Sequence, residues 1–201
     1  MIESILIGLT RLLTGAVVKY RGFSFEPVAQ RIFFANHTSH MDTLLIWASI
    51  PRIYRQQVRP VAAKDYWWKS PVRRYVAERV FNAVPLPRHR EADERDPLQK
   101  LDEALAQGNS LIFFPEGTRG NGECIQPFKA GLYRLILKHP HVSLVPVYID
   151  NLNRVLPKGE LIPVPVLCTV TFGPDFSLQQ GETRGEFTAR AQSELEALAV
   201  E

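Results

Sequence analysis

The chain has 201 residues, of which 45% are hydrophobic and 22% are charged. This composition is typical of a globular protein with one sizeable core, and it excludes a disordered or fibrous chain. A formal net charge of only +3 and the lack of a recognised binding motif argue against nucleic acid as a partner. The two cysteines, Cys124 and Cys168, have no metal-ligand spacing and are expected to be reduced thiols in a cytosolic protein.

The first predicted element is an amphipathic helix at the N-terminus. Its apolar residues recur at helical spacing and are Ile2, Ile5, Leu6, Leu9, Leu12, Leu13, Ala16 and Val17. No stretch of the sequence is apolar over the roughly 18 to 20 residues that a membrane span needs. Residues 1–22 are therefore expected to form a separate helical segment, which either lies in a membrane interface or packs on its own domain's core.

The rest of the chain, residues 23–201, alternates between predicted strands and helices. Strands are expected at Arg31–Ala35, Val58–Ala63, Ser110–Phe114, Val142–Ile149 and Leu167–Phe172, with an ambiguous extended stretch at Asn82–Pro87. Helices are expected at about His40–Ile50, Lys69–Phe81, Pro97–Ala106, Gly131–Leu137 and Gly185–Leu198. This order predicts an α/β fold in a single domain, with a mixed central sheet flanked by helices.

Positive charge is concentrated in one block of the sequence. Between Arg52 and Arg90 there are ten Lys and Arg residues against two acids, Asp65 and Glu78. Such a block suits anionic lipid, a phosphorylated substrate or nucleic acid, and it is equally compatible with an ordinary solvated face.

The first motif with chemical content is Asn-His-Thr-Ser-His-Met-Asp, residues 36–42, where a strand ends and a helix begins. In open α/β sheets this edge is where reactive groups tend to lie. Ser39 and Asp42 also match a helix-capping pattern, which would explain Asp42 without any chemistry. If Ser39 caps the helix, His37 precedes it and can fold back so that one ring nitrogen meets the Asp42 carboxylate. The other nitrogen is then free to act as a general base.

The second motif is Phe-Pro-Glu-Gly-Thr-Arg-Gly, residues 114–120, which again leaves the end of a strand. Arg119 offers a planar fork suited to bidentate binding of phosphate. The alternative is a salt bridge between Glu116 and Arg119 that only stiffens the turn.

Together the two motifs resemble those of the glycerolipid acyltransferase family, which pairs an Asn-His block, with four residues between the His and the following Asp, with a Phe-Pro-Glu-Gly-Thr-Arg block. Weaker matches are Arg88 after an apolar stretch, Phe128–Gly131, and Val145-Pro146-Val147. Leu86-Pro87 departs from the family's usual Ile-Asp before the arginine. The resemblance covers roughly residues 37–147.

The resemblance implies the site and its chemistry. The implied catalytic residues are His37, as general base, and Asp42, which orients it. The implied acceptor-binding residues are Glu116, Gly117, Thr118, Arg119 and Arg88. The implied reaction moves a fatty acyl group from an acyl-CoA or acyl carrier protein thioester to the free hydroxyl of lysophosphatidate or a related lysophospholipid, as in phospholipid biosynthesis. No cofactor or metal is implied, and no nucleophilic Ser or Cys is required.

The implied setting is the cytoplasmic face of a membrane, with peripheral or monotopic attachment. Aromatic residues in the basic block suit a membrane-interface belt, the phosphates of an acyl carrier, or a core helix with a basic edge; they are Tyr66, Trp67, Trp68 and Tyr75.

Two other functions stay open on the sequence alone. His37, His40 and Asp42 could bind a metal in a hydrolase. The chain could also be a lipid-binding module that keeps the fold without catalysis.

Overall fold

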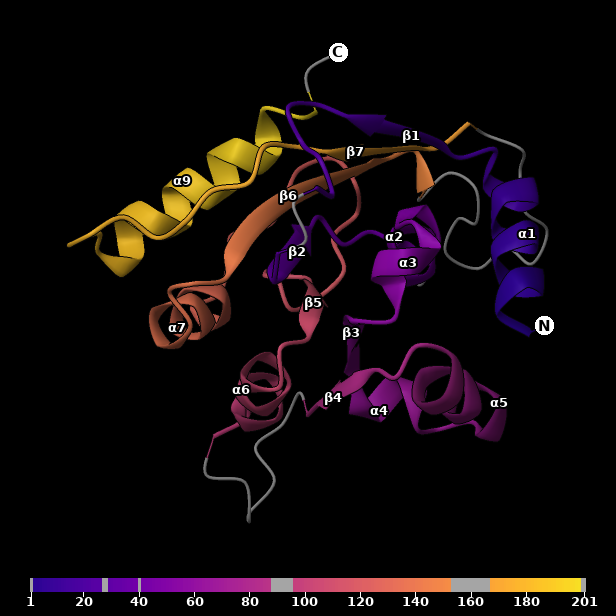
Figure 1. Ribbon diagram of the computed structural model, residues 1–201. Coiled ribbons are helices and arrows are strands. Elements are labelled where there is room, and N and C mark those ends of the chain that lie inside the picture. Colours follow the sequence, from indigo (N-terminus) through magenta and orange to yellow (C-terminus); the bar gives the residue numbers. More distant parts are fainter. Residues whose placement is uncertain (1, 27–28, 40, 88–95, 153–166, 200–201) are drawn as a thin grey trace.

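The strands of the protein form one mixed sheet. The computed structural model describes residues 2–26, 29–39, 41–87, 96–152 and 167–199. Within these ranges the strands are β1 (Val17–Tyr20), β2 (Arg31–Ala35), β3 (Val58–Ala63), β4 (Val84–Leu86), β5 (Ser110–Phe113), β6 (Ser143–Asp150) and β7 (Thr169–Phe172). Their order is β1-β7-β6-β2-β5-β3-β4 (Figure 1). From β6 to β4 neighbouring strands are parallel, whereas β7 is antiparallel to β6 and parallel to β1. The α/β fold with a mixed sheet is confirmed.

Helices cover both faces of the sheet. They are α1 (Ile2–Thr14), α2 (Asp42–Ser49), α3 (Arg52–Arg55), α4 (Lys64–Trp67), α5 (Pro71–Tyr75), the π-helical turn η1 (Val76–Val80), α6 (Gln99–Ala106), α7 (Gly131–Lys138) and α9 (Arg184–Glu196). In Figure 1, α1 to α5 lie to the right of the central strands, and α6, α7 and α9 lie to the left. The two groups of helices thus form separate layers.

The alternation of side chains along β2 supplies both layers with core residues. Phe33 and Ala35 join one apolar cluster, together with Leu45 and Ile46 of α2. Ile32 and Phe34 join the second cluster, which includes residues of α6, α7 and α9. Every residue of β2 is buried, as expected for a central strand covered on both faces.

The N-terminal segment differs from the expectation of one helix-based unit over residues 1–22. Helix α1 ends at Thr14, and Gly15 follows with a φ of +53°, a left-handed conformation that glycine adopts readily. Val17–Tyr20 then pairs with β7 as an edge strand. The expectation was wrong because the glycine ends the helix and the β-branched residues after it complete the sheet.

The orientation of α1 is the second finding in this segment. Thr10 and Thr14 face inward, and each hydroxyl donates to the carbonyl oxygen four residues earlier. Ile5, Leu9 and Leu12 are exposed instead. The helix therefore packs on the domain through Thr10, Thr14 and the half-buried Ile7, and it turns an apolar stripe outward. No described helix is long and apolar enough to cross a membrane.

Candidate active site

The His37 side chain lies where the sequence predicts, between the end of β2 and the start of α2. Its Nδ1 is 2.7 Å from Oδ2 of Asp42, the first residue of α2. The same oxygen accepts the backbone N–H groups of Thr38 and Ser39 at 2.7 and 2.8 Å. Asp42 is fully buried. One carboxylate oxygen therefore holds both the loop and the imidazole ring.

The expected helix cap at Ser39 is not formed in that way. The residue before the helix is Met41, which makes no side-chain cap, and Ser39 Oγ accepts the backbone N–H of Met41 at 3.2 Å. The Asp42 side chain instead accepts hydrogen bonds from the backbone N–H groups that precede the helix. His37 still lies outside the helix, which is the condition for its contact with Asp42.

The loop after β5 holds the backbone of His37. Strands β2 and β5 are adjacent and parallel, so their carboxyl ends meet at one edge of the sheet. The His37 N–H donates to Oε1 of Glu116 at 2.7 Å, and its carbonyl accepts the Gly120 N–H at 2.8 Å. The His37 ring also stacks on Phe114, with centroids 4.3 Å apart. Both backbone groups and one ring face of His37 are thus fixed by a single loop.

Glu116 is part of this loop, and its side chain is buried. Its second oxygen, Oε2, accepts the Gln126 N–H at 3.0 Å. Burial raises the pKa of Glu116, and the two backbone N–H groups oppose that rise. No ion pair joins Glu116 to Arg119 in the described structure, although both residues fall within it. The geometry supports a bracing role for Glu116, and its expected direct contact with the acceptor stays a prediction.

The next three residues turn the loop outward. Gly117 has a φ of +72°, and a Cβ there would lie 2.7 Å from Nζ of Lys129. The left-handed backbone conformation therefore favours glycine at this position, whereas the flexible Lys129 side chain could move away from an added Cβ. Thr118 and Arg119 follow with exposed side chains.

A small pocket joins the two loops. It has a volume of about 40 Å³ and is lined by His37, Thr43, Val61, Ala63, Tyr66, Trp67, Phe114 and Arg119. The pocket brings the imidazole and the guanidinium to one cavity, as the two sequence motifs predict. Its aromatic wall, Tyr66 and Trp67, comes from α4, and the sequence had indicated these residues only as part of a basic and aromatic segment.

Asn36 belongs to the first sequence motif, but the sequence alone assigned it no role. In the structure it supports the site. Its Nδ2 donates to the carbonyl of Ile149 at 2.9 Å, and the Ile149 N–H donates to its Oδ1 at 2.8 Å. These bonds join the end of β2 to β6. The sequence could have indicated this role, because Asn36 directly follows an apolar strand. A polar side chain that is buried at such a position must find hydrogen-bond partners.

Two predicted residues fall outside the described part of the chain, namely Arg88 and His40. Among the described residues no group of three His, Cys, Asp or Glu side chains converges as a metal site would. Asp42 Oδ1 is buried without a hydrogen-bond partner in the described structure. The metal-dependent alternative is thus left to a direct zinc measurement.

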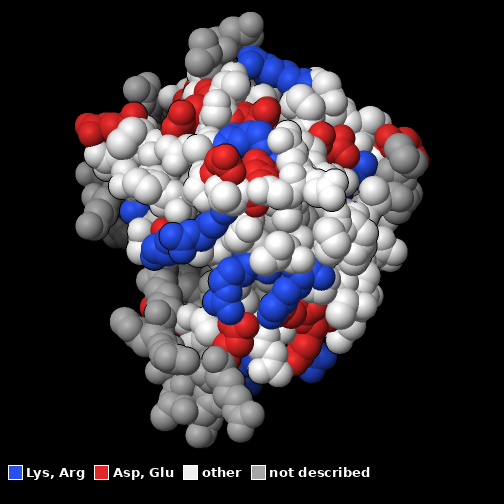
Figure 2. Space-filling view, turned by 90° about the vertical axis from the view of Figure 1, so that its left-hand side faces the viewer, with Lys and Arg blue, Asp and Glu red and all other residues white. Residues whose placement is uncertain are grey.

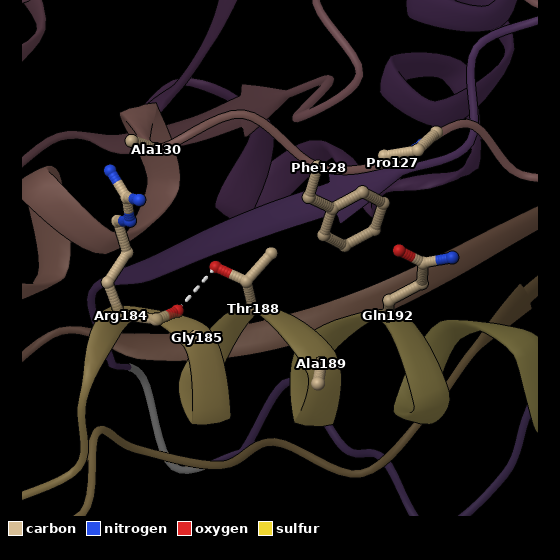
Figure 3. Close-up of a pocket in the computed structure, with 8 residues that line it drawn as sticks. All are labelled: Pro127, Phe128, Ala130, Arg184, Gly185, Thr188, Ala189 and Gln192. Atoms are coloured by element: carbon tan, nitrogen blue, oxygen red, sulfur yellow. Dashed lines mark hydrogen bonds between the residues drawn. The ribbon is translucent and has the colours of Figure 1, made fainter.

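A larger cavity of about 520 Å³ lies away from these loops, between residues 127–130 and α9. Figure 3 shows the Phe128 ring directed toward α9, with Arg184 at one end and Gln192 at the other. The Thr188 hydroxyl donates to the Arg184 carbonyl at 2.7 Å. Among the residues that line this cavity, Arg184 is the ionisable one. This cavity has no acid or base to perform a reaction, so the small pocket at His37 is the candidate active site.

Fold and site together define a class: an α/β protein with a histidine–carboxylate pair and an exposed arginine at the ends of two adjacent parallel strands. Residues 18–150 match the family described as Acyltransferase. The chain therefore belongs to the Acyltransferase family.

Individual relatives agree with this assignment. The 1-acyl-sn-glycerol-3-phosphate acyltransferase of Limnanthes douglasii is 29% identical over 83% of this chain and 57% of its own length. The lyso-ornithine lipid O-acyltransferase of Pseudomonas aeruginosa is 30% identical over 76% of this chain and 55% of its own. The chain thus spans little more than half the length of these curated relatives.

A solved structure shares the fold. The crystal structure of the 1-acyl-sn-glycerophosphate (LPA) acyltransferase, PlsC, from Thermotoga maritima matches 99% of this chain and 80% of that chain, with a TM-score of 0.76 and 21% sequence identity. The likeness extends over both layers of helices.

Proposed function

We propose that this protein transfers a fatty acyl group from an acyl thioester to the free hydroxyl of lysophosphatidate or a related lysophospholipid. The observation that carries this proposal is the 2.7 Å contact between His37 Nδ1 and Asp42 Oδ2, at a pocket that also receives Arg119. The names of the Limnanthes and Pseudomonas relatives support an O-acyltransferase acting on a lysolipid.

His37 is the general base of the proposed reaction. Asp42 Oδ2 accepts hydrogen bonds from two backbone N–H groups and from the imidazole, so Nδ1 carries the proton and Nε2 has the free lone pair. Nε2 takes the proton of the acceptor hydroxyl while its oxygen forms a bond to the thioester carbonyl carbon. The C–S bond then breaks, and the proton passes to the leaving thiolate. A base of this kind contributes about 10²- to 10⁴-fold in rate.

Arg119 binds the acceptor's phosphate in this proposal. Its side chain is exposed and lines the pocket with His37, and a guanidinium binds phosphate through two parallel N–H donors. Gly117 and Thr118 shape the turn that presents it. Arg88 would add a further cation.

Attachment to the cytoplasmic face of a membrane is part of the same proposal. The support comes from α1, whose Leu12 is 80% exposed beside the exposed Ile5 and Leu9. An apolar stripe of this kind lies readily in a lipid interface. The double variant Leu9→Ser with Leu12→Ser tests the membrane attachment of α1. It is a better test than removal of residues 1–20, because that deletion would also remove β1.

The test of the reaction is thiol release from oleoyl-coenzyme A, with and without lysophosphatidate. Wild type should release thiol only when the acceptor is present, and His37→Ala should lose about 10²-fold or more of that rate. His141→Ala is the matched control, because His141 is exposed in the loop between α7 and β6, where its ring hydrogen-bonds to Gln30 and contacts the His139 ring.

If coenzyme A thioesters give no release, an acyl carrier protein thioester is the second donor to test. Release with that donor keeps the reaction and changes the donor. No release with either donor, or equal loss in His37→Ala and His141→Ala, would overturn the proposal. Stoichiometric zinc in active protein would favour the metal-dependent hydrolase instead.

A further inference from the structure

A second helical turn exposes apolar side chains on the α1 side of the sheet. In α5, Val72 is 73% exposed and Tyr75 is 49% exposed, and the helix has no buried residue. The following turn, η1, holds it in place, because Ala77 is buried in the core and Val76 and Val80 pack against that core. The η1 end of this helical segment is thus fixed on the core, whereas the α5 end is exposed.

Helices α1, α3 and η1 adjoin one another on this side. Arg55 of α3 pairs with Glu3 of α1 at 2.8 Å. A cavity of about 120 Å³ is lined by residues of α1, α3 and η1, which include Glu3, Arg52, Arg55 and Val80. Helix α3 adds the exposed Ile53. Figure 1 places α1, α3 and α5 on the side of the sheet opposite α6, α7 and α9.

Cations surround the apolar residues of α5. Lys69, Arg73, Arg74 and Arg79 are exposed. Residues 64–80 contain five Lys and Arg against the two acids Asp65 and Glu78, and Glu78 is paired with Arg74 at 2.9 Å. Exposed apolar side chains within a cationic surround favour a partner that is anionic at its surface and apolar below it. A bilayer with anionic lipid has both properties.

The same segment forms a wall of the active-site pocket. Tyr66 and Trp67 of α4 line the pocket with His37. The Arg73 guanidinium of α5 lies over the Tyr66 ring, 4.4 Å from its centroid. A surface that docks α5 therefore lies close to the mouth of the pocket.

We propose that α5, through Val72 and Tyr75, is a second membrane contact that docks on anionic bilayers beside α1 and holds the pocket mouth at the lipid surface. This contact deepens the proposed function and rests on it, because an acceptor with a fatty chain resides in the bilayer. An acidic carrier protein would suit the cations of α5, but it does not account for the exposed Ile53 and Leu12 on neighbouring helices.

The experiment is co-sedimentation with vesicles made of equal parts phosphatidylglycerol and phosphatidylcholine, without any acyl donor. The variant Val72→Ser with Tyr75→Ser should bind about tenfold more weakly than wild type, because two apolar side chains no longer enter the interface. Leu137→Ser is the matched control: Leu137 is 56% exposed but lies on α7, in the opposite layer, so this variant should bind as wild type does. Unchanged melting temperatures establish that each variant is folded.

Two results would overturn the proposal. The first is a double variant of α5 that binds these vesicles as tightly as wild type. The second is equal weakening in Leu137→Ser, which would mean that the apolar contacts are not confined to one side. A double variant that binds vesicles normally but no longer self-associates, or no longer accepts acyl groups from a carrier protein, would assign α5 to a protein partner instead.

A second measurement separates this contact from the reaction itself. Acyl transfer to a short-chain lysophosphatidate that stays monomeric in water should be equal in wild type and in the α5 double variant. Transfer to a long-chain acceptor in the same vesicles should fall in parallel with binding. Weaker vesicle binding with no transfer to either acceptor would leave the membrane contact standing while the proposed function failed.

Discussion

The two loops that meet at the site are held by carboxylates that work differently. In the loop after β2, Asp42 binds the side chain of His37 and its own neighbouring backbone. In the loop after β5, Glu116 binds the backbone of His37 in the other loop and the backbone of Gln126 ten residues further on. Both acids are buried, whereas Arg119 beside them is exposed.

This difference separates chemistry from support. Asp42 acts on the group that would move a proton, so its charge matters directly. Glu116 fixes the position of His37, so its two acceptor oxygens matter more than its charge. Substitutions in the first loop are expected to lower mainly the rate of the catalytic step. Substitutions in the second loop are expected to change mainly the stability of the protein and the geometry of the site.

The strongest test of this comparison is Asp42→Asn. The amide has about the same shape but lacks the charge that stabilises a protonated His37 and fixes its tautomer. We expect kcat to fall by about 10²- to 10⁴-fold, with KM for the acceptor nearly unchanged. Asp175→Asn is the control, because Asp175 is exposed. Steady-state kinetics that showed a mainly KM effect would remove Asp42 from the proton-transfer step.

Glu116→Gln comes next in expected size. A glutamine has one acceptor oxygen, so either the His37 N–H or the Gln126 N–H loses its partner. The free energy of unfolding should fall by about 1 to 3 kcal/mol, the usual loss when a buried donor is left unpaired. Urea unfolding measures it, and Glu123→Gln in the same loop is the control, since Glu123 is exposed and bonds to Asn121. A stable variant with a large loss of acceptor affinity would instead favour direct contact between Glu116 and the acceptor.

The raised pKa of Glu116 gives this variant a pH signature. A carboxyl group whose pKa is higher in the folded protein binds its proton more tightly there than in the unfolded chain. Its contribution to stability is therefore fully present below the unfolded pKa and is lost as pH rises through the folded pKa. The difference in unfolding free energy between wild type and Glu116→Gln should grow in favour of wild type as pH falls through that window. A difference that shrinks on acidification would contradict the direction of the shift.

The loops also show what the sequence could predict. Strand ends, the placement of His37 before α2, and its contact with Asp42 follow from local patterns, because each depends on residues close together in the chain. The direction of the Glu116 side chain depends on His37, which is 79 positions earlier, and no local pattern contains that information. The helix end at Gly15 was missed for a different reason: apolar residues continued at helical spacing through Ala16 and Val17, and the sheet edge that Val17 joins is formed by β7.

Arg119→Lys tests the exposed part of the second loop. Lysine keeps the charge but replaces the planar fork by a single ammonium, so one of two parallel hydrogen bonds to a phosphate is lost. We expect KM for lysophosphatidate to rise about tenfold, in line with a hydrogen bond to a charged group, while kcat changes little. Arg184→Lys on α9, at the cavity of Figure 3, should have no effect. A change confined to kcat would place Arg119 at the thioester instead of the phosphate.

The smallest expected effect concerns the outer end of the second loop, where Cys124 is exposed. Cys168 is buried in the core, and burial raises the pKa of its thiol to about 11, so little thiolate is present at neutral pH. A thiol reagent should therefore modify one cysteine in the native protein and both after unfolding. Labelling of Cys124 should lower kcat only slightly, because its Sγ contacts the side chain of Gln126, whereas Glu116 holds the Gln126 backbone. If the label instead lowered kcat as far as Asp42→Asn does, the second loop would take a direct part in the catalytic step, and the division between a catalytic and a supporting loop would no longer hold.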